Sequence, residues 1–290
     1  MSSPPPVSIG MPVFNGEKYV VQAIDSILGQ SYSDFELIIS DNASDDRTPE
    51  ICQEFARKDS RIRYFRQASN VGAPRNFNFV FREAHGRYFK WAAANDVCDR
   101  DLVAVCKKVL DERPEVVLCF GKTVAIDQEG RMLSPVGDNL VIEDARPSRR
   151  FRHVVDHLQY NNVHAGLFRS DSLRKTMLEK PYPSGDLVMI AELALYGLFC
   201  EVPQVLFYRR EAPGTATKFR SSSEILQLCA PHSTTRRYWP MWRSVFGYFQ
   251  ATLRSPIGVS EKARICRYLL RRCVSYRRNL WNELASNLRG

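Results

Sequence analysis

The chain has 290 residues, of which 44% are hydrophobic and 25% are charged, and its formal net charge is +9. This length and composition suit one large globular domain, or one domain plus an appendage, and no apolar run reaches the roughly 18 residues of a spanning helix. The start, MSSPPPVSIGMPV, lacks the features of a secretory signal, and the eight cysteines show neither paired nor zinc-like spacing, so we expect a cytoplasmic protein with free thiols.

Short apolar runs alternate with amphipathic segments from the N-terminus to about residue 126. Runs such as VSIGMPV and FELIIS predict buried strands, and the segments between such runs carry apolar residues at helical spacing. The predicted strands are 7–13, 35–40, 61–66, 87–94 and 116–126, and the predicted helices are 16–30, 49–58, 74–84 and 101–114. Because this alternation is typical of βαβ units, the sequence predicts an α/β fold with a mostly parallel central sheet flanked by helices.

Two of these strands lead into a carboxylate. Asp41 follows FELIIS, and Asp96 follows RYFKWAAA with Asn95 before it. Ligands of such sheets bind outside the carboxyl ends of the strands, so both side chains are expected at one ligand-binding rim. A dinucleotide site and a P-loop are the competing interpretations. No Gly-x-Gly-x-x-Gly follows the first strand, however, and Glu17 stands where the P-loop lysine belongs.

The order of the motifs is more specific than any one of them. The sequence shows MPVFNGEKY, then GQSY, ELIISDNASDDRT and SNVGAPRN, and then the strand that leads into Asn95 and Asp96. This set resembles the family 2 glycosyltransferases of the GT-A fold over roughly residues 5–215. The resemblance implies a Rossmann-like GT-A catalytic domain at 1–219, which binds a nucleoside diphosphate sugar, and leaves 220–290 as a C-terminal helical extension.

The resemblance also implies a set of residues that bind the donor. Asp41 would bind the nucleotide, although local amides of an Asx turn are an alternative partner. Gly72 would supply a positive φ or a close backbone approach, and Arg75 would face phosphate or else lie at a solvated helix start. Asp46 and Thr48 are expected to cap a helix. The implied donor-binding residues are Pro12, Phe14, Asn15, Asp41, Asn70, Gly72, Arg75 and Asn95.

Asp96 matches the last position of the family's Asp-x-Asp metal-binding segment. Mg²⁺ and Mn²⁺ keep water and phosphate oxygens in their shell, so one protein carboxylate can hold them. The sequence departs from the family pattern at Ala93 and Asn95, where carboxylates are common. Metal affinity is then low without donor, or arginine neutralises part of the diphosphate charge. A helix cap is the alternative role for Asp96.

The region after residue 160 resembles the acceptor half of the family. Asp186 matches the position of the catalytic base, which an inverting transferase needs beside the acceptor hydroxyl. A helix cap is its alternative role, and Glu192 is a reserve base, although a salt bridge is more ordinary inside a helix. Arg209 and Arg210 are candidates to lie near the diphosphate. His164 is either an acceptor contact or a structural residue.

The C-terminal segment differs in charge from the rest. Residues 220–290 carry 13 Lys and Arg against 3 Asp and Glu, which is typical of a surface for an anionic partner. Residues 261–288 read as a basic amphipathic helix, whose apolar face either packs on the catalytic domain or a second subunit, or lies at an anionic membrane. The body shows no nucleic-acid-binding motif. The residues of the apolar face are Ile265, Leu269, Tyr276, Leu280 and Leu284.

These observations predict an inverting hexosyl- or deoxyhexosyl-transferase that uses Mg²⁺ or Mn²⁺. It would move one sugar to a hydroxyl of a glycan or lipid-linked acceptor in cell-envelope glycan biosynthesis, in the cytoplasm or at the inner face of the membrane. Its C-terminal helices would then make a peripheral membrane contact or a homo-oligomer. The alternative, which Ala93 and Asn95 suggest, is a catalytically silent protein that binds sugar nucleotides or assembles with other proteins.

Overall fold

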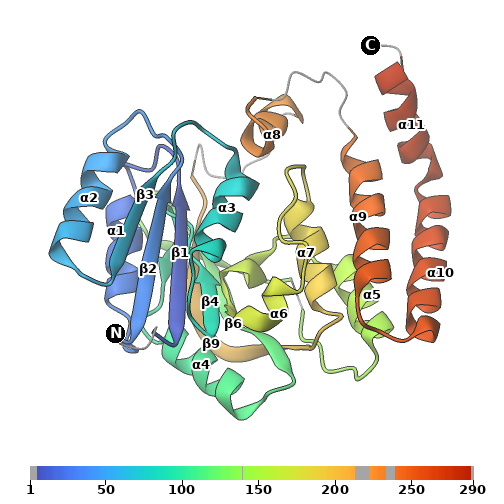
Figure 1. Ribbon diagram of the computed structural model, residues 1–290, viewed down its shortest axis with the longest axis horizontal. Helices are drawn as coiled ribbons and strands as arrows, with labels where there is room; N and C mark the ends of the chain where they lie inside the picture. Colours follow the sequence, from blue (N-terminus) through green and yellow to red (C-terminus); the bar gives the residue numbers. More distant parts are fainter. Residues whose placement is uncertain (1–4, 139, 213–221, 233–238, 289–290) are drawn as a thin grey trace.

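A computed structural model describes residues 5–138, 140–212, 222–232 and 239–288 (Figure 1). A mixed β-sheet forms its centre, with the strand order β3-β2-β1-β4-β8-β6-β9-β5 and β7 paired to β6. The strands are β1 Val7–Val13, β2 Phe35–Asp41, β3 Ile62–Arg66, β4 Tyr88–Trp91, β5 Val97–Cys98, β6 Val116–Ile126, β7 Met132–Val136, β8 Leu167–Arg169 and β9 Leu198–Arg210.

Helices cover both faces of this sheet (Figure 1). The helices of the first part are α1 Val20–Leu28, α2 Thr48–Lys58, α3 Ala73–Arg82, α4 Leu102–Glu112, α5 Pro147–His157, α6 Ser170–Arg174 and α7 Gly185–Leu193, with a 3₁₀ turn at Asn162–Ala165. The helices of the C-terminal part are α8 Ser222–Cys229, α9 Pro240–Arg254, α10 Val259–Ser275 and α11 Arg277–Leu288.

Successive residues of β1 face opposite sides of the sheet and pack against different helices on each side. Ile9 and Met11 are fully buried in a cluster with Ile24 of α1. Gly10 faces the opposite side, where an added Cβ would lie 2.6 Å from Cγ2 of Val80 in α3. The glycine therefore lets α3 pack directly on the sheet, and this packing fixes the start of α3 beside the carboxyl ends of the strands.

The predicted parallel sheet is confirmed in its N-terminal half. The strands β3, β2, β1 and β4 are parallel neighbours, and Val13 pairs with Asp41 at the end of the β1–β2 ladder. The second half is mixed, because β6 pairs with β9 in parallel but with β7 and β8 in antiparallel. The strand predicted at 87–94 ends earlier, since its ladder with β1 stops at Trp91 and the chain then turns out of the sheet.

The helices α9 and α10 pack on the α5–α7 side of the molecule, whereas α8 lies beside α3 (Figure 1). Ile265 and Leu269 of α10 are buried in the same cluster as Phe151 of α5, so this part of the predicted apolar face packs within the chain, whereas Tyr276 is 43% exposed. The helix predicted at 261–288 is two helices, which are separated at Tyr276. The predicted boundary at residue 219 lies outside the described residues. Over the part of the chain that is described, no helix has the length and apolarity needed to cross a membrane.

Candidate functional site

The loops after β1 and β2 are tied together at the predicted rim. The backbone N–H of Asn15 donates to Ser44 Oγ at 2.9 Å, and Asn15 Oδ1 accepts from the N–H of Asp45 at 3.1 Å. Asn15 has a φ of 48°, a left-handed conformation that Asn tolerates better than most residues. Beside it, Pro12 is buried in β1 and Phe14 is 46% exposed, so Phe14 presents a ring to solvent at the strand end.

The predicted capping residues of α2 have different partners. Asp46 Oδ1 accepts from the N–H of Thr48 at 2.9 Å, which satisfies a donor at the helix start as expected. The Thr48 hydroxyl instead accepts from the N–H of Gly16 at 2.8 Å, and it does not cap the helix. Thr48 therefore holds the β1–α1 loop against α2.

Asp41 is fully buried, and its two carboxylate oxygens have partners within the protein. Oδ1 accepts from the N–H of Ser44 at 2.9 Å, and Oδ2 accepts from the Tyr64 hydroxyl at 3.0 Å. Burial and the Asp41 charge together raise the pKa of Tyr64, so the phenol stays a donor. The Asx-turn alternative is thus present, and contact between Asp41 and a nucleotide stays a prediction.

The segment before α3 is built around Asn70 and Gly72. Asn70 Oδ1 accepts from Asn42 Nδ2 at 2.8 Å and from the N–H of Gly72 at 2.9 Å. Gly72 has a φ of 86°, so the predicted positive φ is confirmed, and an added Cβ would lie 2.5 Å from the carbonyl oxygen of Cys229 at the end of α8. Arg75 is exposed on the first turn of α3, where its guanidinium is accessible to a ligand.

Asp96 is half-buried in the loop after β4. Its Oδ1 accepts from the N–H of Arg210 at 2.8 Å and from Asn95 Nδ2 at 3.0 Å. The next helix begins at Leu102 with Asp101 as its N-cap, so Asp96 is not a helix cap. Burial raises the pKa of Asp96 to about 6, against the lowering effects of the Arg210 N–H and of nearby cations.

Arg210 orients this loop from beneath. Its side chain is fully buried, with Nε donating to the Asn95 carbonyl at 2.9 Å and Nη1 donating to the Asp127 carbonyl at 2.7 Å. Arg210 is therefore held by backbone carbonyls rather than directed at the rim. Arg209, the neighbouring residue, donates from Nη1 to the carbonyl of Tyr160 at 2.8 Å and remains beside Asp96 as an electrostatic partner.

The donor set at Asp96 fits a hard divalent ion that takes most of its ligands from elsewhere. Among the described residues, no group of three or more His, Cys, Asp or Glu is placed to hold a metal. The described residues donate no hydrogen bond to Asp96 Oδ2, so this carboxylate oxygen is available to a ligand at the rim. Mg²⁺ and Mn²⁺ accept such a site when water and a donor diphosphate complete the shell.

Asp186 lies in the first turn of α7 and is bound by a side chain of another segment. The N-cap of α7 is Ser184, whose φ is 66°, and its side chain makes no capping hydrogen bond. Asp186 Oδ2 accepts from Asn161 Nδ2 at 2.6 Å. The helix-cap alternative is thus not realised, and the carboxylate keeps a second oxygen for another proton donor.

Asp138 is a buried carboxylate whose role the sequence did not reveal. It holds the turn 159–162, which contacts Arg209 beside Asp96 and also contacts Asp186. Asp138 accepts three backbone N–H groups of the turn 159–162, at 2.8, 2.5 and 3.0 Å. This turn directs Asn161 to Asp186 and accepts the Arg209 guanidinium. The only sequence signal was the turn-forming stretch VGDN, which names no partner.

Two other candidates have structural roles. Glu192 is fully buried, and its Oε1 accepts from Arg254 Nη1 of α9 at 2.8 Å, so the reserve base is an ion-pair partner that joins α7 to α9. Burial raises the pKa of Glu192. The His164 ring stacks on Trp91 with centroids 4.4 Å apart, and its Nε2 lies 2.7 Å from Glu179 Oε1. This is the structural alternative for His164.

Comparison with known proteins places the chain in a family. The model of the family described as Glycosyl transferase family 2 matches residues 8–178, more than half of the chain. The chain belongs to glycosyl transferase family 2. It is therefore a glycosyltransferase by family, and the predicted resemblance is confirmed.

Curated relatives give the same family assignment, and solved structures show the same fold. The chain is 29% identical to glycosyltransferase GlyG of Streptococcus pneumoniae over 107 residues, which cover 37% of this chain and only 36% of GlyG. The fold is similar to that of S. aureus TarS 1-349 in complex with UDP, with a TM-score of 0.68 at 14% identity over 94% of this chain and 73% of TarS. The mannosyltransferase PcManGT from Pyrobaculum calidifontis, in complex with GDP-Man and Mn²⁺, has a TM-score of 0.52 at 13% identity and covers 97% and 84%. The predicted GT-A fold is thereby confirmed.

Proposed function

We propose that the protein transfers a single sugar, with inversion, from a nucleoside diphosphate sugar to a hydroxyl of a glycan or lipid-linked acceptor in cell-envelope glycan assembly. The observation that carries this proposal is the turn 159–162, which links the two candidate centres. One side of the turn accepts Arg209, which lies beside Asp96, and the other side donates to Asp186. The carboxylate proposed to face the donor and the carboxylate proposed to face the acceptor would thus be connected through one structural unit.

The donor would lie along the carboxyl ends of β1, β2 and β4. Phe14 and Asn15 would contact the nucleotide from the β1–α1 loop, with Pro12 beneath them and Asp41 at the end of β2. Asn70 and Gly72 would shape the opposite wall. Arg75, whose guanidinium is accessible, would balance part of the diphosphate charge. Asn95 would orient the Asp96 carboxylate, as their hydrogen bond indicates.

Asp96 Oδ2 would hold the Mg²⁺ or Mn²⁺ ion, which supplies charge neutralisation of the diphosphate leaving group. The neighbours TarS and PcManGT are recorded with UDP and with GDP-Man and Mn²⁺, which supports a nucleotide-linked donor and a divalent ion in this fold. Because one carboxylate must serve without Asp at positions 93 and 95, we expect metal affinity to rise when donor is bound.

Asp186 would act as the general base. Asn161 holds Oδ2, so Oδ1 would accept the proton of the acceptor hydroxyl as its oxygen attacks the anomeric carbon. The bond from that carbon to the phosphate oxygen breaks at the same time, and the nucleoside diphosphate leaves with the bonding electrons. Attack opposite to the leaving group inverts the anomeric centre.

The test is a thermal-shift panel of UDP-, GDP- and dTDP-sugars with and without Mn²⁺. A donor that binds only the folded state, at a concentration of 100 times its dissociation constant, adds about 2.7 kcal/mol to the free energy of unfolding. In a domain of this size, that raises the melting temperature by about 5 °C. We expect one nucleotide class to give this shift with Mn²⁺. The absence of a shift with every donor would contradict the proposal.

The silent-protein alternative stays open because Ala93 and Asn95 depart from the family pattern. In that case a donor would stabilise the protein, but no nucleoside diphosphate would be released.

We assign donor binding and catalysis to residues 1–219. We assign to residues 220–290 a peripheral location at the inner membrane face, with formation of a homo-oligomer as the other role of this extension.

A further inference from the structure

The helices α10 and α11 have a second face that the sequence did not distinguish. Figure 1 shows the two helices end to end at the edge of the molecule, with α9 between them and the sheet. Their inner face buries Ile265, Leu269 and Leu280. Within α10 the outer face carries Arg267, Leu270, Arg271 and Val274, at spacings of 3, 4 and 7 from the first, which lie on one side of a helix. Arg278 and Trp281 are exposed on α11, which continues in line with α10 (Figure 1). This outer stripe consists of Arg267, Leu270, Arg271, Val274, Arg278 and Trp281.

The outer stripe is apolar and cationic at once. Leu270, Val274 and Trp281 are 59%, 62% and 67% exposed, which leaves three large apolar side chains in water on neighbouring turns. The three arginines are also exposed, and none of them forms an ion pair with the described residues. Exposed apolar groups that gather on one surface mark an interaction site rather than an ordinary solvated face.

No acidic side chain of the two helices belongs to the stripe. Glu261 accepts from the N–H of Ser148 at 2.8 Å, and Glu283 accepts from the N–H groups of Met241 and Trp242 at 2.9 and 3.1 Å. Both glutamates therefore face the body of the protein. The positive charge of the stripe is not balanced locally, so its partner should be anionic and apolar together.

We propose that the outer stripe docks on the surface of an anionic phospholipid membrane. Leu270, Val274 and Trp281 would enter the boundary between head groups and acyl chains, and the arginines would meet lipid phosphates. A symmetric contact between two copies would bring the arginine rows together, which opposes a dimer through this face. This proposal deepens the peripheral location proposed above and does not depend on the transfer chemistry.

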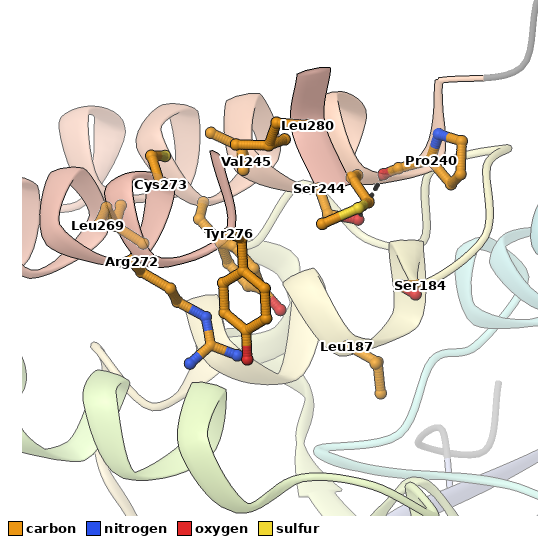
Figure 2. Close-up of a pocket in the computed structure, with 12 residues that line it drawn as sticks. Ser184, Leu187, Pro240, Ser244, Val245, Leu269, Arg272, Cys273, Tyr276 and Leu280 are labelled. Atoms are coloured by element: carbon orange, nitrogen blue, oxygen red, sulfur yellow. Dashed lines mark hydrogen bonds between the residues drawn. The ribbon is translucent and has the colours of Figure 1, made fainter. Parts of the chain in front are cut away.

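The inner side of α10, opposite the outer stripe, lies near the start of α7, which carries the candidate base Asp186. A cavity of about 340 Å³ lies between α7, α9 and α10 (Figure 2). Ser184 and Leu187, which flank Asp186 in the sequence, line it together with Leu269 and Cys273 of α10. The start of α7 is thus one helix layer behind the outer stripe. A protein docked in this way would hold Asp186 near a membrane, where a lipid-linked acceptor would be found.

The first experiment measures co-sedimentation of the 290-residue chain with vesicles of phosphatidylcholine and phosphatidylglycerol in equal parts, without donor. We expect binding at 50 mM salt, loss of binding at 0.5 M salt, and none to pure phosphatidylcholine. The triple variant R267Q/R271Q/R278Q should bind roughly 100-fold more weakly, since each arginine near the surface contributes about fivefold. The matched control K58Q/R100Q/R131Q removes the same charge from side chains that are 70%, 74% and 74% exposed, and should bind within threefold of wild type.

The second experiment tests insertion of the apolar residues. Brominated lipids should quench part of the tryptophan fluorescence of the wild type, and Trp281→Phe should lose that quenching while it remains folded. Equal loss of binding in the stripe and control variants would overturn the proposal, and so would a wild-type protein that ignores anionic vesicles at low salt. Tight binding to an RNA homopolymer without vesicle binding would also overturn it. Because donor is absent throughout, these outcomes are independent of whether the protein transfers sugar.

Discussion

Asp41 and Asp186 differ in how much of each carboxylate the protein itself uses. Asp41 is buried with both oxygens hydrogen-bonded, whereas Asp186 accepts one described hydrogen bond, from Asn161. A general base needs an oxygen that can receive a proton, so the free oxygen of Asp186 suits that role. The arrangement of Asp41 instead suits a rigid support for the β2 end of the rim.

The variant Asp186→Asn tests this assignment. The amide oxygen can still accept from Asn161, but the side chain cannot take a proton, so turnover should fall by roughly 10²-fold or more while donor affinity stays within about twofold. Steady-state kinetics with titration of the donor separate the two effects. Near-normal turnover would show that another group is the base.

At this scale the sequence identified the residue types at the rim but not their partners. The motifs placed Asp96 and Asp186 at the positions where the structure has an available carboxylate oxygen. They did not reveal that Arg210, a candidate near the diphosphate, is bound by carbonyls beneath the loop. A pair of adjacent arginines at a strand end carries no information on which one faces the ligand, because successive side chains of a strand point to opposite faces.

The turn 159–162 is the element on which the proposed site depends. It has no regular hydrogen-bond ladder of its own, and Asp138 replaces that ladder by accepting three N–H groups. A single buried carboxylate thereby fixes the direction of both Asn161 and the Arg209 contact. Irregular segments of this kind are where functional side chains are often positioned.

The variant Asp138→Ala should leave three N–H groups without their acceptor. We expect a loss of roughly 3 kcal/mol in the free energy of unfolding, since hydrogen bonds to a charged group are each worth about 1.5 to 3 kcal/mol and water replaces part of them. Turnover should fall further than stability explains, because Asn161 no longer holds Asp186. Denaturant unfolding and kinetics measure both effects. The control is Asp171→Ala, whose side chain is 82% exposed and should change stability by less than about 0.5 kcal/mol.

Elements with strong periodicity were predicted well. The strands at 7–13 and 116–126 are confirmed residue for residue, because apolar runs bounded by turns leave little choice. The strand predicted at 87–94 extends too far, since the run AAA is apolar but leaves the sheet once its ladder with β1 ends. The outer stripe was not predicted, because a helix with two apolar faces reads as one face until its packing partner is known.

The stability of the whole molecule depends on how the C-terminal helices attach to the sheet-containing part. Glu192 of α7 and Arg254 of α9 form an ion pair across this contact, and the Glu192 side chain is fully buried. Breaking a pair of this kind leaves a buried charge, which costs more than the pair contributes. Attachment of α9 is thus linked to the same helix that carries Asp186.

The variant Arg254→Ala should show a pH-dependent loss of stability. Burial already raises the pKa of the Glu192 carboxyl in the folded protein. Above this folded-state pKa the carboxylate is ionised while buried, which lowers the free energy of unfolding. This loss disappears as the pH falls toward the pKa of the residue in the unfolded chain. We expect about 2 kcal/mol of destabilisation near pH 8, less than for a fully buried pair because Arg254 is 41% exposed, and a smaller difference near pH 5. The double variant with Glu192→Gln should lose this pH dependence. A deficit that is constant with pH would contradict the explanation.

The central claim is that this chain transfers a sugar from a nucleoside diphosphate donor bound at Asp96. The most direct measurement is release of nucleoside diphosphate in the presence of Mn²⁺, compared between the wild type and Asp96→Asn, whose amide oxygen can still accept from the Arg210 N–H. We predict that the wild type releases nucleoside diphosphate from the donor class that stabilises it, and that Asp96→Asn is slower by roughly 10²-fold because one carboxylate is the protein's share of the metal shell. Equal release by both proteins would remove Asp96 from the site, and no release by the wild type with a donor that binds would contradict transferase activity.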